Sequence, residues 1–133
     1  MSDKLAAIVT TGDLQKIVEL VGICRDAAER GNAVRLFFRD ESIPLISRPE
    51  ARLRVSPALP ASLHETRELG TEGLATALEH LATFSDVELS ACSSSLYLWG
   101  LKAGDLIPAI SGARGLIAFL ADDLDGAQHV VSC

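Results

Sequence analysis

The sequence predicts an α/β protein, a three-layer sandwich in which helices cover both faces of a mostly parallel sheet of four or five strands. The first observation behind this prediction is the opening of the chain, where an apolar run, a long amphipathic stretch and a second apolar run succeed one another as in a βαβ unit. The second is that strand-like and helix-like patterns keep alternating to the last residues. The 133 residues of the chain are expected to form a single domain, 1–133, with a sizeable core.

The opening βαβ unit accounts for the first third of the chain. Lys4–Thr10 is almost continuously apolar, which is typical of a strand buried on both faces. Asp13 is a suitable N-cap for the amphipathic helix that follows, and Gly31 is a suitable end for it. Ala33–Arg39 is the second predicted strand. Cys24 lies within the apolar stripe of the helix, so we expect it to be buried in the core.

The middle of the chain differs from the rest in composition and in its apolar pattern. Four prolines fall between residues 44 and 60, and apolar periodicity is weak there. Helical spacing of apolar residues resumes over Thr71–Phe84. We therefore expect a long connection over residues 44–70, followed by a helix. A connection of this length in a compact domain is usually either functional or mobile.

The last third alternates between short elements. Residues 86–91 alternate between apolar and polar, which predicts a strand that ends at Cys92 and passes into a short helix. A turn or short helix is expected over 103–110, where Pro108 interrupts it. Residues 112–124 are expected to form a helix that begins near two glycines, and 127–132 the last strand.

Cys92 is the candidate catalytic residue. It stands where a predicted strand passes into a predicted helix, and Ser93 and Ser94 follow it. Serine hydroxyls are good helix N-caps, and the unpaired N–H groups at a helix N-terminus stabilise an anionic sulfur. Ser93 and Ser94 are therefore candidate anion-stabilising residues. The alternative interpretation is that Cys92 is a small buried hydrophobe.

Three predicted strands bring polar segments to one edge of the sheet. Thr10–Gly12, Asp40–Ser42 and Cys92–Ser94 each follow a strand. Ligands of parallel α/β sheets bind beyond the carboxyl ends of the strands. Thr11 and Gly12 are therefore further candidate anion-stabilising residues, and the convergence favours a reactive Cys92 over an inert one.

A family resemblance points the same way. The run SACSSSLYLWGLKAGDLI resembles the segment around the shared cysteine of the DsrE/DsrF-like sulfur-relay proteins, with matches at Ala91, Cys92, Gly100, Lys102, Asp105, Leu106 and Ile107. The opening LAAIVTTGDLQKIVELVGICRDAAERGNAVRLFFRDESI looks like that family's first strand, helix and second strand, and the closing AFLADDLDGAQHVVSC like its last helix and strand. The resemblance implies a sulfurtransferase-like activity and homo-oligomers, trimers or hexamers, whose sites lie near subunit contacts.

The leading hypothesis is a sulfur carrier. Cys92 would take a sulfane sulfur, hold it as a persulfide and pass it to a partner thiol, so sulfur donor and acceptor proteins are the expected partners. This requires a sulfur that is open to solvent or to a docking partner. Cys133 is a candidate second thiol, and its alternative interpretation is an incidental tail thiol. The central connection is either a solvated loop, a subunit contact or a flap that brings cations to the sulfur; its basic residues are Arg48, Arg52, Arg54, His64 and Arg67.

Two other hypotheses stay open. Thr10–Asp13 follows a strand and opens a helix, so the loop could bind a phosphate or a flavin nucleotide without catalysis. The chain could also be a scaffold subunit with an inert cysteine. No dinucleotide or P-loop glycine motif occurs, and the histidines and cysteines lack metal-ligand spacing. We expect neither a cofactor nor a metal.

Composition limits the partners and the location. The net charge is −6 and no Lys/Arg-rich run occurs, so nucleic acid and anionic membranes are not expected partners. The N-terminus does not look like a signal peptide, and the longest uncharged run is too short to cross a bilayer. Three cysteines, an odd number, suit a reducing compartment better than a disulfide framework. A cytoplasmic location is the expectation.

Overall fold

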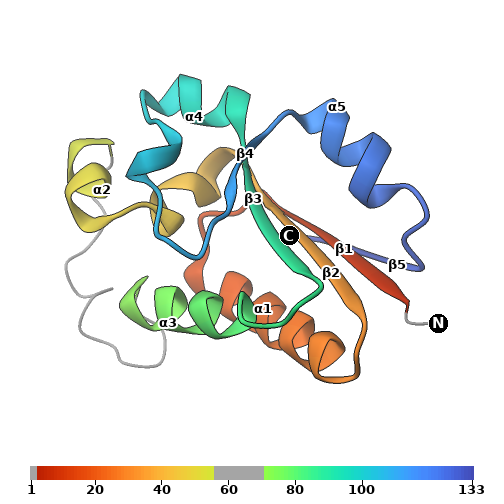
Figure 1. The fold of residues 1–133 in the computed structure, drawn as a ribbon. Coiled ribbons are helices and arrows are strands. Elements are labelled where there is room, and N and C mark those ends of the chain that lie inside the picture. The colour runs from red at the N-terminus through yellow and green to blue at the C-terminus, as the bar shows by residue number, and fades with distance from the viewer. Residues whose placement is uncertain (1–2, 56–70) are drawn as a thin grey trace.

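A five-stranded, all-parallel sheet organises the molecule, with strand order β4-β3-β2-β1-β5 (Figure 1). The computed structural model describes residues 3–55 and 71–133. The strands are β1 (Lys4–Val9), β2 (Ala33–Phe38), β3 (Val87–Cys92), β4 (Gly112–Arg114) and β5 (His129–Ser132). The predicted α/β class with a parallel sheet is confirmed.

The connections place helices on both faces of the sheet. Helices α1 (Leu14–Glu29) and α3 (Thr71–Leu81) lie below the sheet in Figure 1, and α5 (Leu116–Phe119) lies above it. From β1 to β4 the chain advances in one direction across the sheet, and β5 then returns to the far side of β1. Right-handed crossovers put the helix of such a return on the opposite face, which is where α5 is found.

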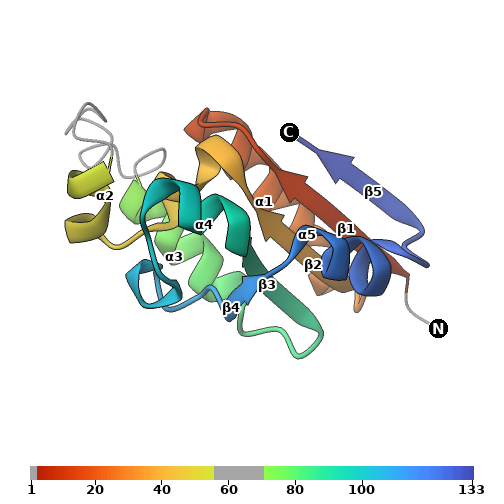
Figure 2. The ribbon, with the colours of Figure 1, turned by 90° about the horizontal axis from the view of Figure 1, so that it is seen from above.

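Short elements at the carboxyl ends of the strands complete the fold. The 3₁₀ segment η1 (Asp40–Ile46) follows β2 and leads into α2 (Pro49–Val55), and α4 (Ser93–Trp99) follows β3 (Figure 2). A 3₁₀ turn, η3 (Ala103–Asp105), and a π-helical turn, η4 (Leu120–Leu124), complete the described elements. No helix in residues 3–55 or 71–133 is both long enough and apolar enough to span a membrane.

The two faces of the sheet carry different cores. The face under α1 and α3 has the large cluster, in which residues such as Ile17, Leu36 and Leu78 are fully buried. The face under α5 has a small one, made of Ala6, Phe37, Cys92 and Phe119. The rings of Phe37 and Phe119 stack with centroids 4.5 Å apart, and this contact holds α5 against the sheet.

The sequence predicted most of these elements, with three corrections. Asp13 does cap α1, because its carboxylate accepts hydrogen bonds from the N–H groups of Gln15 and Lys16. Residues 112–114 are a strand rather than the start of a helix, and their backbone pairs with β3. The predicted connection over 44–70 contains helical turns up to Val55, and the buried Ile43, Leu45 and Ile46 anchor them. The third correction concerns the N-cap of α4, which is Cys92 rather than a serine.

Candidate functional site

Cys92 ends β3 and caps α4, so it stands at the carboxyl edge of the sheet as predicted. Its register partner on β4 is Arg114. On the other side, Phe38 of β2 pairs with Ala91, so Arg39 follows β2 beside Cys92. Residues in register on parallel strands point to the same face. Arg39, Cys92 and Arg114 therefore form one row across three neighbouring chain segments, on the face covered by α5.

The Cys92 residue is only 2% exposed. It packs in the small cluster with Ala6, Phe37 and Phe119. The expectation of an open sulfur is therefore wrong for this conformation of the single chain. The cover comes from the segment that follows β4, whose position over the sheet was not predicted.

Both arginines of the row keep a buried Nε atom that has no hydrogen-bond partner among the described residues. Arg39 Nε lies 3.4 Å from a carboxylate oxygen of Asp40. Arg114 Nη2 donates to the carbonyl of Ala118 at 3.2 Å and to Asp122 at 3.0 Å. The backbone register thus places two arginines in the row of Cys92, and the buried Nε of each lies within ion-pair distance of a carboxylate without making a hydrogen bond. An anion bound at Cys92 would satisfy donors that are otherwise costly to bury.

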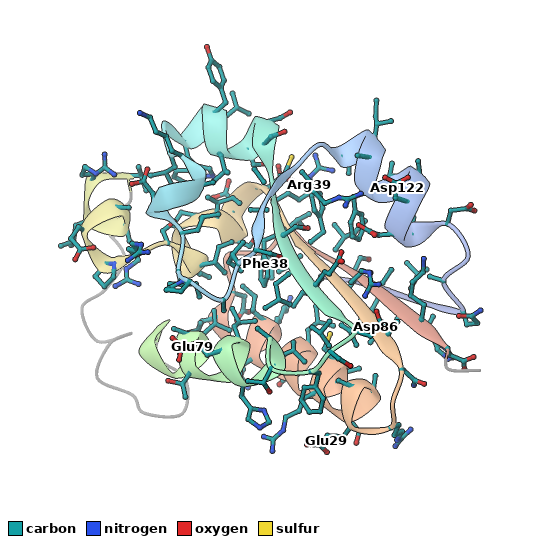
Figure 3. The ribbon with its side chains drawn as sticks, viewed as in Figure 1. Glu29, Phe38, Arg39, Glu79, Asp86 and Asp122 are labelled. Carbon is teal, nitrogen blue, oxygen red and sulfur yellow. The ribbon has the colours of Figure 1, made fainter. Side chains whose placement is uncertain are left out.

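Asp123 attaches the covering segment to the sheet. Its carboxylate is nearly buried and lies 3.3 Å from Arg114 Nε and 3.7 Å from Arg35 Nε. Arg35 also pairs with Asp86 at 2.9 Å, at the opposite end of the strands (Figure 3). The π-helical turn that carries Asp123 therefore depends on charge pairs as well as on Phe119.

Of the candidate anion-stabilising residues, only the serines lie beside Cys92. Ser93 and Ser94 are exposed in the first turn of α4, directly after the cysteine. Thr11 and Gly12 follow β1, and β2 separates β1 from β3. With strands about 5 Å apart, that loop starts about 10 Å from Cys92. The structure does not bring Thr11 and Gly12 to the sulfur.

The Thr10–Asp13 loop is also occupied by the chain itself. The N–H groups of Thr10 and Thr11 donate to the carbonyl of Cys133 at 2.9 and 3.1 Å, and the Thr10 hydroxyl donates to it at 2.8 Å. The N–H of Asp13 donates to the Thr11 hydroxyl. The N–H groups of Thr10, Thr11 and Asp13, which could otherwise bind a phosphate, are thus used within the protein.

Cys133 lies on the other face of the sheet from Cys92. Its N–H donates to the carbonyl of Ile8 in β1, and its side chain packs against the large cluster, which contains Cys24. The structure therefore does not place Cys133 to resolve a persulfide on Cys92 of the same chain. Burial, and secondarily the nearby Cys133 sulfur, raises the pKa of the Cys24 thiol to about 12. Cys24 is a core residue, as predicted.

The basic residues of the central connection do not form a flap over Cys92 where the structure describes them. Arg48 Nε donates to the carbonyls of Gly104 and Leu106, and Arg54 pairs with Asp105 at 3.1 Å. Both therefore attach α2 to the η3 turn. Arg52 is buried, and burial lowers the pKa of its guanidinium. His64 and Arg67 lie outside the described residues.

Sequence reasoning missed Arg39 and Arg114 as site residues. The sequence placed Arg39 correctly at the end of a strand, and the alternation of that strand puts it on the face opposite Phe38. Arg114 had no such signal, because GAR is too short to show a period.

A hollow lined by Asp40, Glu41, Ser95, Leu98 and Trp99, with a volume of about 350 Å³, was also missed. Among residues 3–55 and 71–133, no three His, Cys, Asp or Glu side chains group as a metal site.

Comparisons with known proteins show the fold and nothing finer. No family model and no curated protein matches the sequence. A solved structure of a protein of unknown function, MTH1491 from Methanobacterium thermoautotrophicum, is similar with a TM-score of 0.66. The similarity covers 98% of this chain and 99% of that chain, at 13% sequence identity. The two chains thus share an α/β fold.

Proposed function

We propose that this protein is a sulfur carrier of the DsrE/DsrF-like kind, which holds sulfane sulfur as a persulfide on Cys92. The observation that carries the proposal is the row formed by Arg39, Cys92 and Arg114, in which the Nε of each arginine is buried and makes no hydrogen bond. The contacts of these atoms are ion pairs, with Asp40 at 3.4 Å and with Asp123 at 3.3 Å. A structural core cysteine needs no guanidinium groups beside it. An anionic sulfur does, because a charge in a nearly buried site is stable only with partners.

The proposed step is a thiol exchange. The Cys92 thiolate attacks the outer sulfur of a donor persulfide, a new S–S bond forms at Cys92, and the donor's own S–S bond breaks. The donor leaves as a thiolate and takes up a proton from water. An acceptor thiolate later attacks the outer sulfur in the same way, which restores Cys92. The steps exchange one S–S bond for another, so no outside oxidant is needed.

Access to the sulfur requires the segment over it to move. Helix α5 has four residues, and the π-helical turn η4 continues it. Ile117 on its outer side is 82% exposed, so the segment is held from one side only. We assign to it the role of a cover that excludes water from the persulfide and opens for donor and acceptor.

The partners follow from this chemistry. A donor protein and an acceptor protein must each present a sulfur at the carboxyl edge of the sheet. Assembly into a trimer or hexamer and a cytoplasmic location belong to the same proposal. A phosphate or flavin ligand has less support, because the N–H groups of Thr10, Thr11 and Asp13 are used within the protein and the nearby hollow is lined by Asp40 and Glu41.

Intact mass spectrometry tests the function. Protein incubated with glutathione persulfide should gain the mass of one sulfur, and dithiothreitol should remove it. Cys92→Ser should abolish the gain, whereas Cys24→Ser and Cys133→Ser should keep it. Equal loading of the Cys92→Ser variant would overturn the assignment.

A further inference from the structure

The hollow beside α4 is the feature that the sulfur chemistry leaves unused. It lies at the carboxyl ends of β2 and β3, where η1 and α4 meet, and has a volume of about 350 Å³. Asp40 and Glu41 line it from η1, and Ser95, Leu98 and Trp99 line it from α4. This volume is at the lower end of the range for small-ligand sites. The position is also where parallel α/β sheets bind ligands.

The walls of this hollow are fixed by hydrogen bonds. Asp40 has a φ of 55°, a left-handed conformation that is costly for a residue other than glycine. Its N–H donates to the Ser95 hydroxyl at 3.0 Å, and its carbonyl accepts from the indole N–H of Trp99 at 2.9 Å. Both bonds join η1 to α4, so the two sides of the hollow are held at a set separation. When a ligand enters a preformed pocket, little binding free energy is lost to ordering the protein.

The charge in this hollow is negative. The Asp40 carboxylate is partly balanced by Arg39, whose Nε is 3.4 Å away. Glu41 makes no ion pair with any residue in the described part of the chain. The remaining lining is an aromatic ring, an apolar side chain that is 82% exposed (Leu98) and a buried hydroxyl (Ser95). One unpaired carboxylate beside an indole suits a cation and disfavours phosphate or carboxylate ligands.

We propose that this hollow binds an organic cation, namely an ammonium or guanidinium group on a short aliphatic stem. Glu41 pairs with the charged head, the Trp99 ring lies along the cation and Leu98 packs on the stem. A free amine and a lysine side chain of a partner protein share this chemistry. The cation site does not use the thiol of Cys92. A negative result for cation binding would therefore leave the sulfur-carrier proposal unaffected, and the reverse also holds.

Trp99 makes the proposal directly measurable, because it is the single tryptophan of the chain. Butylammonium should change the tryptophan fluorescence in a saturable way, whereas butyrate, which has the same stem and the opposite charge, should not. Glu41→Gln should weaken butylammonium binding about tenfold, the effect of losing one charge-assisted hydrogen bond. Glu79→Gln is the matched control, because Glu79 is an exposed residue of α3 beneath the sheet (Figure 3). Cys92→Ser should bind as the unmodified protein does.

A second arm identifies the source of the cation. Lysine capped as its N-acetyl methylamide presents the same head on a peptide, and tighter binding than butylammonium would indicate a partner's side chain. Tighter butylammonium binding would indicate a free amine. Absence of a saturable response to both probes would overturn the proposal, as would equal affinity of Glu41→Gln and the unmodified protein. Leu98→Ala, at an exposed position, repeats the test should Glu41→Gln fail to fold, and it should weaken both probes.

Discussion

Cys92 of β3 and Arg114 of β4 are register partners on adjacent parallel strands, so sulfur and guanidinium share one face of the sheet. Arg39 occupies the corresponding position after β2. The pairing follows from backbone hydrogen bonds and does not depend on flexible side-chain positions. Any charge that develops on the sulfur therefore forms on the face of the sheet that also carries Arg39 and Arg114.

The first prediction concerns the lifetime of the persulfide. Arg39→Met keeps an unbranched stem and removes the guanidinium group and its charge, so a persulfide on Cys92 should be lost roughly tenfold faster, as expected from one charge-assisted hydrogen bond. The decay of the added mass in intact mass spectra measures this rate. Arg39 is the better position for this substitution, because Arg114 also donates hydrogen bonds to Ala118 and Asp122.

Arg30→Met is the matched control for that comparison. Arg30 is exposed beyond the end of α1 and pairs with Asp26 at 2.9 Å. Its loss should leave the decay unchanged. Equal decay in Arg39→Met and the unmodified protein would show that the row of arginines does not stabilise the persulfide.

The second prediction concerns the cover over Cys92. Phe119→Ala removes a buried ring that stacks on Phe37, which should lower the free energy of unfolding by about 3 kcal/mol. It should also loosen α5, so iodoacetamide should label Cys92 several-fold faster. Cys24, on the other face of the sheet, should keep its slow rate.

Labelling of the two cysteines followed by peptide mass spectrometry separates local from global opening. An equal rise in the labelling of Cys92 and Cys24 would mean that the whole domain unfolds, and the cover would have no separate motion. Phe119→Leu, a smaller change, should also speed the labelling of Cys92 and not that of Cys24, with a smaller loss of folding free energy.

The sequence was sufficient to predict the framework because each of those elements has a local signal. The unbroken apolar run of β1, the Asp13 cap of α1 and the alternation in β3 are all readable without tertiary information. The position of Cys92 at a strand end was readable for the same reason. Local pattern does not show which segment covers a residue, which is why an open Cys92 was favoured over the buried alternative.

The missed features depend on contacts between distant segments. β4 is three residues long, and its strand character comes from pairing with β3 rather than from its own composition. Gly112, which begins this strand, and Gly115, which follows it, favoured a helix start instead. The opposite faces of Cys92 and Cys133 follow from the register of β5 against β1, and the cysteine spacing carries no such information.

The third prediction uses the raised pKa of Cys24. Burial raises the pKa of the Cys24 thiol from its ordinary value of 9.0, expected in the unfolded chain, to about 12 in the folded protein. Between these values the unfolded state has lost a proton that the folded state keeps, so stability falls as pH rises, by up to about 1.4 kcal/mol per pH unit. Below pH 9 the Cys24 thiol keeps its proton in both states, so its full contribution to the free energy of unfolding is present.

Urea unfolding of the unmodified protein and of Cys24→Ala, from pH 8 to pH 11, measures this effect. Cys24→Ala should be the less stable at pH 8, because it leaves a cavity, and the difference should shrink above pH 9. The other ionisable side chains are common to both proteins, so their contribution to the pH dependence cancels. A constant difference across the range would show that Cys24 is not the group responsible.

The last prediction compares two glycines that differ in backbone conformation. Gly100 caps α4 with a φ of 72°, so Gly100→Ala should cost about 1 kcal/mol, although no atom would contact the new Cβ. Gly22 lies in the interior of α1 without a positive φ, and a Cβ there also meets nothing within 4 Å. Gly22→Ala should therefore stabilise the protein by up to about 1 kcal/mol.

Thermal or urea unfolding of both variants gives the two free energies. Gly104→Ala serves as a third case, since it has neither a positive φ nor a neighbour within 4 Å and lies in a 3₁₀ turn, and it should change stability by less than about 0.5 kcal/mol. Because all three sites have open space for the Cβ, steric contact cannot produce the expected order. Stabilisation by Gly100→Ala would mean that α4 ends in a different conformation, and the position of Trp99 beside Asp40 would then need revision.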